Sequence, residues 1–208
     1  MESALSDRAG APGLKLIETL GWTGQDFPRL PLHLARLAAS TDRLGWACDP
    51  DAARAALLDA APEKAARIRL TLDAAGQVDI QVSPLPPTKP VWSLTLAATR
   101  LSSADPWLSL KSTRRAAYDQ TRAALPTGAD EAIFLNELGE VCDGTITTLF
   151  FDRGQGMRTP PLTCGLLPGV LRAELAVPEE VLLADELRHV RLWVGNSLRG
   201  LIPAVWAG

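Results

Sequence analysis

Proline dominates the middle of this chain. The eight residues from Ser83 to Pro90 read Ser-Pro-Leu-Pro-Pro-Thr-Lys-Pro and include four prolines. Proline fixes φ and removes a backbone donor, so this stretch favours an extended, semi-rigid connector. A chain of 208 residues is long enough for two small domains. We therefore expect a small lobe over residues 1–83, a linker over 84–90 and a larger lobe over 91–208.

Both expected lobes mix strands with helices. Before the linker, apolar residues at helical spacing predict a helix from Leu30 to Leu44 that ends at Gly45. Alternation of apolar and polar residues predicts strands over 14–20, 67–72 and 77–82, and a second helix runs to Ala60. After the linker we expect strands over 92–98, 131–136, 147–152 and 190–194, with helices over 113–125 and 167–175. This pattern predicts an α+β or α/β fold.

Composition excludes several classes of protein. The net charge of -3 argues against binding to nucleic acid or to an anionic membrane. No apolar run approaches the roughly 20 residues needed to span a bilayer, and the first ten residues lack the apolar core of a signal peptide. Three scattered cysteines indicate reduced thiols in a cytoplasmic protein. With only His33 and His189, neither a His-rich metal site nor a Ser-His-Asp hydrolase is favoured.

Lys111 is the first candidate for chemistry. Lysine is rare here and occurs only at Lys15, Lys64, Lys89 and Lys111. Lys111 follows apolar residues and precedes Arg114 and Arg115, and both partial burial and neighbouring cations lower the pKa of an ammonium group. A lowered pKa suits Schiff-base chemistry. The alternative is an ordinary solvated lysine.

Three later segments could hold an anion or assist a reaction. Asp143-Gly144 precedes Thr-Ile-Thr-Thr and an apolar strand, which places a carboxylate beside an apolar wall, although the pair could be a plain turn. Gly-Leu-Leu-Pro-Gly169 leads into a helix whose first amides lack partners, a common anion site. Val194 to Gly200 reads as a strand end with small polar donors, or as a simple turn.

Taken in order, these segments resemble the class IV aminotransferase family of fold-type IV pyridoxal-phosphate enzymes. The resemblance rests on Lys111, the acid-Gly-Thr segment at Asp143, Thr-Pro-Pro-Leu with Gly-Leu-Leu-Pro-Gly, and Asn-Ser-Leu-Arg-Gly200. Ile17-Glu-Thr-Leu and the His-x-x-Arg-Leu pattern at Arg36 agree with it. The family includes branched-chain aminotransferases, D-amino acid aminotransferases and aminodeoxychorismate lyases.

The resemblance implies a role for each of these positions. It implies two lobes with pyridoxal 5′-phosphate in the cleft, and a cytoplasmic homodimer acting on a small amino substrate. Lys111 matches the lysine that forms the Schiff base and moves the proton, and Asp143 falls where the family has a glutamate facing the pyridine nitrogen. The remaining cofactor contacts that it implies are Arg36, Thr148, Gly169, Val170, Leu171, Asn196 and Ser197.

Departures from the family pattern concern mainly the substrate. Asp143 is one methylene shorter than glutamate, and Thr148 and Arg114 stand where asparagine is usual. The family's Thr-Arg-Gly after the strand at 68–72 is replaced by Thr-Leu-Asp-Ala-Ala-Gly76, which lacks an arginine that some members use for the substrate carboxylate. The last two motifs look most like the aminodeoxychorismate lyase branch, which releases pyruvate to give 4-aminobenzoate for folate biosynthesis. An amino-acid aminotransferase and a cofactor-binding paralogue without activity stay as alternatives.

Overall fold

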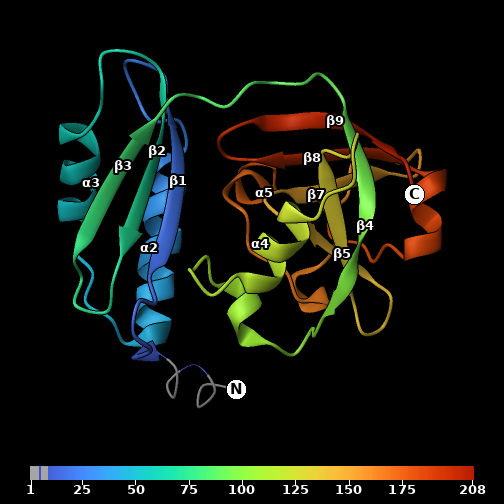
Figure 1. The fold of residues 1–208 in the computed structure, drawn as a ribbon, viewed down its shortest axis with the longest axis horizontal. Coiled ribbons are helices and arrows are strands. Elements are labelled where there is room, and N and C mark those ends of the chain that lie inside the picture. The colour runs from blue at the N-terminus through green and yellow to red at the C-terminus, as the bar shows by residue number, and fades with distance from the viewer. Residues whose placement is uncertain (1–4, 6–8) are drawn as a thin grey trace. The chain divides into compact units, whose positions relative to one another are not determined.

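A computed structural model describes residue 5 and residues 9–208. The chain folds into two compact units, shown in Figure 1. The first unit comprises Met1–Pro87 together with Leu110–Arg114. The second comprises Thr88–Ser109 and Arg115–Gly208. Residue 111 therefore belongs to the first unit, whereas residues 143–197 belong to the second.

The first unit is a three-stranded antiparallel sheet with two helices. The strands lie in the order β1-β2-β3, with Leu16 opposite Leu72 and Leu72 opposite Val78. Helix α2 contacts β1, α3 contacts β3, and the two helices contact each other, so they share one face of the sheet (Figure 1). The element bounds are β1 Leu16–Trp22, α2 Leu30–Leu44, α3 Pro50–Asp59, β2 Ala66–Leu72 and β3 Val78–Ser83.

Local signals set the ends of these helices. Proline in the first turn of α2 loses no intrahelical hydrogen bond, and Gly45 ends the helix in the left-handed region at φ 65°. Asp49 caps α3, since its carboxylate accepts hydrogen bonds from the amides of Asp51 and Ala52. The helix predicted from Leu30 to Leu44 is confirmed.

Residues 110–114 extend the first unit by pairing with the start of β1. The amide of Ile17 donates to the carbonyl of Lys111 at 2.8 Å, and the amide of Thr113 donates to the carbonyl of Lys15 at 2.8 Å. Leu16 and Ser112 form the antiparallel bridge between them. The helix predicted to begin at residue 113 was therefore wrong at its start, because this segment is extended; α4 spans Ala116–Ala123.

The second unit is built on a six-stranded mixed sheet in the order β6-β5-β4-β9-β8-β7. Strand β4 runs parallel to both β5 and β9, and the other pairs are antiparallel. Its main core includes Ile133, Leu149, Phe151 and Val194. The strands are β4 Trp92–Leu101, β5 Glu131–Asn136, β6 Val141–Gly144, β7 Thr148–Asp152, β8 Arg191–Asn196 and β9 Gly200–Trp206, with α5 at Val170–Leu175 and 3-10 helices at Pro106–Ser109, Leu162–Cys164 and Ala184–His189.

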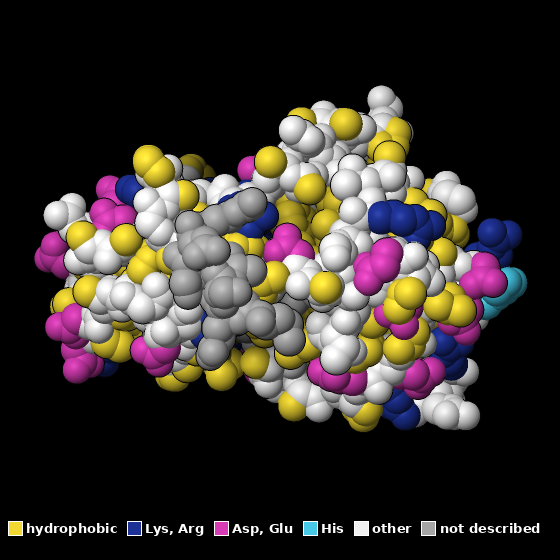
Figure 2. Space-filling model, turned by 90° about the horizontal axis from the view of Figure 1, so that it is seen from below, with side chains coloured by type: hydrophobic (Ala, Val, Ile, Leu, Met, Phe, Trp, Pro, Cys, Tyr) yellow, Lys and Arg dark blue, Asp and Glu magenta, His cyan; other side chains and the backbone are white. Residues whose placement is uncertain are grey.

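Two strands of this sheet were not predicted. Strand β6 has only four residues, and β9 contains Pro203, which as a rule counts against a strand. Strand β9 follows the strand predicted over 190–194 and pairs with it, and β7 pairs with the other edge of that same strand, β8. Within the described residues, every helix is too short or too polar to cross a bilayer. Figure 2 shows acidic and basic side chains scattered among hydrophobic ones on the face in view.

Candidate functional site

In the second unit, Thr148 and Gly169 lie in direct contact. Thr148 is the first residue of β7, and Gly169 is the N-cap of α5. A Cβ atom added to Gly169 would lie 2.6 Å from the Thr148 hydroxyl oxygen, which is closer than real side chains approach. Glycine at 169 therefore lets the first turn of α5 come against the start of β7.

A second glycine brings the end of β8 to the same helix. A Cβ atom at Gly195 would lie 2.5 Å from Leu171 Cδ2 and 2.6 Å from the carbonyl oxygen of Gly200. Gly195 is also the strand partner of Thr148. The start of α5, the start of β7 and the end of β8 thus meet at one place, and this place includes the predicted cofactor residues Thr148, Gly169 and Leu171.

Asn196 shapes the turn that follows β8. Its side-chain oxygen accepts hydrogen bonds from the amides of Leu198 and Arg199, at 3.1 and 3.0 Å. Its Nδ2 donates to the carbonyl of Ile146 at 3.1 Å. Asn196 therefore links the turn that contains Ser197 to the loop before β7, and protein groups already engage its side-chain oxygen and nitrogen.

Asp143 lies in β6 with only 5% of its surface exposed. Its Oδ2 accepts a hydrogen bond from the amide of Leu167 at 3.2 Å, and the hydroxyl of Tyr118 donates to Oδ1 across 3.4 Å. Burial, and after it the charge of Asp143, raises the pKa of Tyr118 far above its usual value. Tyr118 therefore stays protonated and acts as a donor toward the carboxylate.

Arg172 fixes the segment that leads to α5. This buried arginine donates through Nη1 to the hydroxyl of Thr159 and to the carbonyl of Pro160, both at 2.7 Å, and its Nη2 pairs with Glu179. Sequence reasoning singled out the Pro-Pro-Leu segment but not Arg172. A guanidinium with three acceptors holds both ends of the segment 159–172 together.

In the first unit, Lys111 lies beside β1. Antiparallel pairing at Leu16 and Ser112 sets Lys111 opposite Ile17, so their side chains share one face of the pairing. That is the face of Thr19 and of its β2 partner Arg69. Lys111 is neither fully buried nor fully exposed.

Arg36 extends from α2 onto the buried carboxylate of Glu18. Arg36 Nε lies 2.8 Å from Glu18 Oε1 and Nη2 lies 2.6 Å from Oε2, while His33 Nδ1 lies 2.6 Å from Oε2. Burial alone would raise the pKa of Glu18, but the charge of Arg36 and the hydrogen bonds from His33 and Arg36 outweigh it and lower that pKa to about 2. The carboxylate is therefore ionised at neutral pH.

Sequence reasoning also missed Glu131, a fully buried carboxylate at the start of β5. It accepts hydrogen bonds from the loop that joins β6 to β7, which carries Asp143 at one end and Thr148 at the other. A glutamate that opens the apolar run Ala-Ile-Phe-Leu was the available signal, because a charged residue is seldom fully buried without partners.

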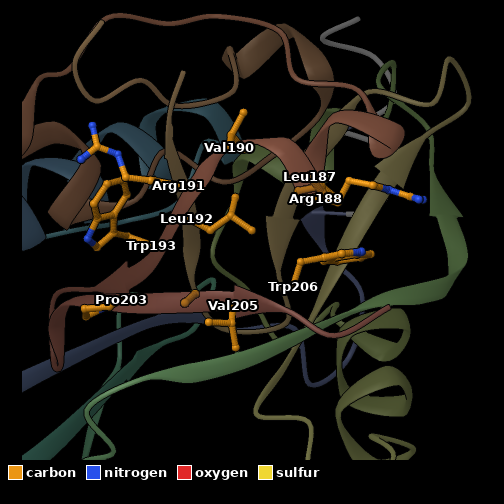
Figure 3. A pocket seen from close by; sticks show the side chains of 10 residues that line it. Leu187, Arg188, Val190, Arg191, Leu192, Trp193, Pro203, Val205 and Trp206 are labelled. Atoms are coloured by element: carbon orange, nitrogen blue, oxygen red, sulfur yellow. The ribbon is translucent and has the colours of Figure 1, made fainter. Parts of the chain in front are cut away.

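A surface hollow in the second unit lies apart from these residues. Its volume is about 420 Å³, and Figure 3 shows side chains from β8, β9 and the 3-10 helix before β8 around it. None of the predicted cofactor residues lines it. Its lining residues are Leu187, Arg188, Val190, Arg191, Leu192, Trp193, Pro203, Ala204, Val205 and Trp206.

These features belong to one family of enzymes. The model of the amino-transferase class IV family matches residues 15–205, and the chain is a member of that family. Both the resemblance inferred from the motifs and the predicted mixed fold are confirmed. The chain is therefore an enzyme of the class IV aminotransferase type.

Similar proteins within the family are named either as aminodeoxychorismate lyases or as amino-acid aminotransferases. A Schizosaccharomyces pombe protein named as a candidate aminodeoxychorismate lyase is 31% identical over 170 residues, 77% of this chain and 72% of that protein. A crystal structure of a candidate amino-acid aminotransferase from Mesorhizobium loti matches with a TM-score of 0.87 and 45% identity, over 93% of this chain and 100% of that chain. The structure of 4-amino-4-deoxychorismate lyase from Pseudomonas aeruginosa matches with a TM-score of 0.83 and 25% identity, over 96% and 85%.

Proposed function

We propose that this chain binds pyridoxal 5′-phosphate and uses it to release pyruvate from 4-amino-4-deoxychorismate, giving 4-aminobenzoate. The observation that carries the cofactor assignment is the meeting of Thr148, Gly169 and Leu171 at the start of α5. Because Gly169 leaves no space for a Cβ atom, the Thr148 hydroxyl lies close to the N-cap of α5, whose first-turn amides follow. Hydroxyls and such amides are the donors that a phosphate dianion requires.

In this proposal each residue has one task. The first-turn amides at Gly169, Val170 and Leu171 bind phosphate oxygens, together with Thr148. The turn after β8 contributes through Ser197 and the backbone at Asn196, because the Asn196 side chain is occupied by Ile146 and by the turn itself. The family resemblance assigns the same phosphate to the guanidinium of Arg36, which Glu18 orients within the first unit.

Two further residues act on protons. When bound, pyridoxal phosphate supplies an electron-withdrawing ring that accepts the electrons of a bond broken at the substrate α-carbon. The carboxylate of Asp143 would keep a proton on the ring nitrogen, and the Tyr118 hydroxyl and the Leu167 amide hold that carboxylate in place. The amine of Lys111 would hold the cofactor and would move the proton at the substrate α-carbon.

The choice of lyase rests on the Gly-Leu-Leu-Pro-Gly and Asn-Ser-Leu-Arg-Gly segments and on the names of two relatives. An amino-acid aminotransferase is the second candidate, favoured by the name of the 45% identical structure. A lyase needs no keto-acid acceptor, whereas an aminotransferase does. Pyruvate release from aminodeoxychorismate should therefore proceed at the same rate with and without added keto acid; strict dependence on a keto acid would identify an aminotransferase.

A chemical test addresses the cofactor lysine. The purified protein should absorb visible light when loaded with pyridoxal phosphate, and borohydride should abolish that band and leave a covalent adduct on Lys111. Peptide mass spectrometry would locate it, with Lys89→Ala as the matched control that keeps the adduct. An adduct on Lys15, Lys64 or Lys89 contradicts the assignment. Cofactor uptake with neither lyase nor aminotransferase activity would favour the inactive paralogue, and failure to take up the cofactor would refute the cofactor assignment itself.

The family resemblance also leads us to propose a homodimer. Apolar side chains stay exposed in both units, including Val82, Leu138 and Val205, and such residues suit a subunit interface. Light scattering after size-exclusion chromatography should give about twice the chain mass of 22.2 kDa. A monomer at micromolar concentration would contradict the proposal.

A further inference from the structure

Glu131 is a fully buried carboxylate of the second unit, and both of its oxygens accept hydrogen bonds. It is 0% exposed. Oε1 accepts hydrogen bonds from the amides of Thr145 at 2.9 Å and Ala132 at 3.0 Å and from the Thr145 hydroxyl, and Arg122 Nη1 lies 3.4 Å away. Oε2 accepts from the amide of Ile146 at 3.2 Å and from the hydroxyl of Thr147 at 2.9 Å. Apart from Ala132 and Arg122, every donor belongs to the loop between β6 and β7.

That loop is closed around the carboxylate. A Cβ atom on Gly144 would lie 2.6 Å from the Thr147 hydroxyl oxygen and 2.7 Å from Glu131 Cδ, so only glycine fits there. The outer side of the loop is held as well: Arg115 Nη2 donates to the carbonyl of Thr145 at 3.0 Å, and Asn196 Nδ2 donates to the carbonyl of Ile146 at 3.1 Å. Hydrogen bonds therefore hold the loop backbone from both sides, with Glu131 enclosed by it.

The loop connects two residues of the proposed site. Asp143 precedes Gly144, and Thr148 follows Thr147, so the whole connection between them is the four residues that enclose Glu131. A short connection pinned at its backbone fixes the separation and orientation of both ends. Asn196 joins the same loop to the turn after β8, so three proposed cofactor contacts depend on one buried carboxylate.

We propose that Glu131 is a positioning residue for the cofactor: it touches no substrate, and it sets Asp143 toward the ring nitrogen and Thr148 toward the phosphate. This inference rests on the proposed function, since it assigns Glu131 to the same cofactor site. A side chain of the same shape cannot replace the carboxylate, because both carboxylate oxygens accept hydrogen bonds from backbone amides. Glutamine would replace one acceptor by an amide donor and set two donors against each other.

The main test compares Glu131→Gln with the wild type in three measurements. Hydrogen exchange of the amides of residues 144–148, in protein without cofactor, should become at least tenfold faster. The dissociation constant of pyridoxal phosphate, measured by fluorescence titration, should rise at least tenfold. The pH midpoint of the bound cofactor's visible band should shift, because that midpoint responds to the carboxylate facing the ring and not to stability alone.

Glu186→Gln is the matched control for loss of a hydrogen-bonded carboxylate. Glu186 pairs with Arg153 and caps the amide of Leu183 in the same unit, and it touches none of residues 143–148. The Glu186→Gln variant should have a lower free energy of unfolding, but its cofactor affinity and its pH midpoint should equal those of the wild type. If Glu131→Gln leaves exchange, affinity and midpoint at wild-type values, or changes them no more than Glu186→Gln does, the proposal is wrong.

A milder pair of variants covers the case in which Glu131→Gln does not fold. Thr147→Val removes one donor to Glu131 with little change of volume, and Thr147→Ser keeps that donor. We expect Thr147→Val to speed exchange at residues 144–148 and weaken cofactor binding at least threefold, and Thr147→Ser to restore both. Equal values for the two variants overturn the positioning role. Wild-type protein that takes up no cofactor refutes the proposed function instead, and faster exchange in Glu131→Gln would still support the role of Glu131 in ordering the loop.

Discussion

Arg36 and Glu18 form a two-point ion pair in the first unit, with Nε 2.8 Å from Oε1 and Nη2 2.6 Å from Oε2. Glu18 lies on β1 and Arg36 on α2, so the pair ties the helix to the strand that also pairs with Lys111. Two parallel hydrogen bonds hold a planar guanidinium in one orientation. The arginine predicted to bind phosphate is thus oriented by the fold itself.

The ion pair predicts acid-sensitive stability. The pKa of Glu18 is about 2 in the folded protein against 4.5 for the free side chain. The ionised form is therefore favoured by folding, and its contribution is complete above pH 4.5 and lost as the pH falls toward 2. At one pKa unit per 1.4 kcal/mol, this is on the order of 3 kcal/mol. Glu18→Gln should lose about that much at pH 7.

Urea unfolding at pH 7 and pH 3 tests this. The wild type should lose more stability on acidification than Glu18→Gln does, because the variant lacks the group that titrates. Glu63→Gln, an exposed carboxylate of the same unit, is the matched control and should behave as the wild type. Parallel pH dependences for all three proteins would show that Glu18 contributes no acid-sensitive stability.

Arg36→Ala should weaken the binding of pyridoxal phosphate by about 2–3 kcal/mol, since a charge-assisted contact to phosphate is lost. The free energy of unfolding should fall as well. The variant leaves Glu18 buried with only one of its two partners, His33. Cofactor titration well below the melting temperature separates the two effects. Arg43→Ala, on the exposed face of the same helix, should keep wild-type affinity; equal affinities in both variants would exclude Arg36 from the phosphate site.

The contact between Gly169 and Thr148 predicts a measurable coupling. Gly169 has φ -67°, so alanine is acceptable to the backbone and the only conflict is its Cβ at 2.6 Å from the Thr148 hydroxyl oxygen. Gly169→Ala should cost about 1–3 kcal/mol of unfolding free energy. Removing the hydroxyl with Thr148→Ala should recover at least about 1 kcal/mol in the double variant. Additive losses in chemical denaturation would show that the two residues do not touch.

The parts of the fold that the sequence predicted are those with local signals. Helix α2 combines leucines at helical spacing with Pro31 at its start and Gly45 at its end, and all of this information lies within sixteen residues. By contrast, the pairing of Lys111 with Ile17 joins residues far apart in the chain, so no local pattern reports it. Strand β9 was missed because Pro203 breaks its pattern, although its neighbours β4 and β8 hold it in the sheet.

The residues of the candidate site also fall into those that the sequence indicates and those that only the fold reveals. Lys111, Asp143 and the Gly-Leu-Leu-Pro-Gly segment stand out because residue types and their order suffice to suggest a family. Glu131 and Arg172 do not, because their importance lies in partners that the fold brings to them: Glu131 binds a loop 14–16 residues away, and Arg172 binds Thr159 and Pro160. A single sequence shows which groups are chemically able to react, but not which buried groups hold them.

Asp143 is the residue at which the sequence departs from the family pattern closest to the chemistry. It is nearly buried, and it receives the Leu167 amide on one oxygen and the Tyr118 hydroxyl on the other. Asp143→Asn keeps the size of the side chain and an oxygen for the Leu167 amide. It removes the charge and turns the group beside Tyr118 into an amide donor, which the Tyr118 hydroxyl can accept. If the carboxylate keeps the ring nitrogen protonated, this variant should bind cofactor and lose at least about tenfold in turnover, or roughly 1.4 kcal/mol of barrier.

Two comparison variants test whether the charge of Asp143 is what matters. Asp143→Glu should retain activity, because it restores the reach that is usual in the family. Tyr118→Phe is the control for packing: it removes one hydrogen bond and leaves the charge, so its loss should be smaller. Turnover at saturating cofactor decides the matter, and a near-normal rate for Asp143→Asn would assign this residue to the packing of β6 and not to the reaction.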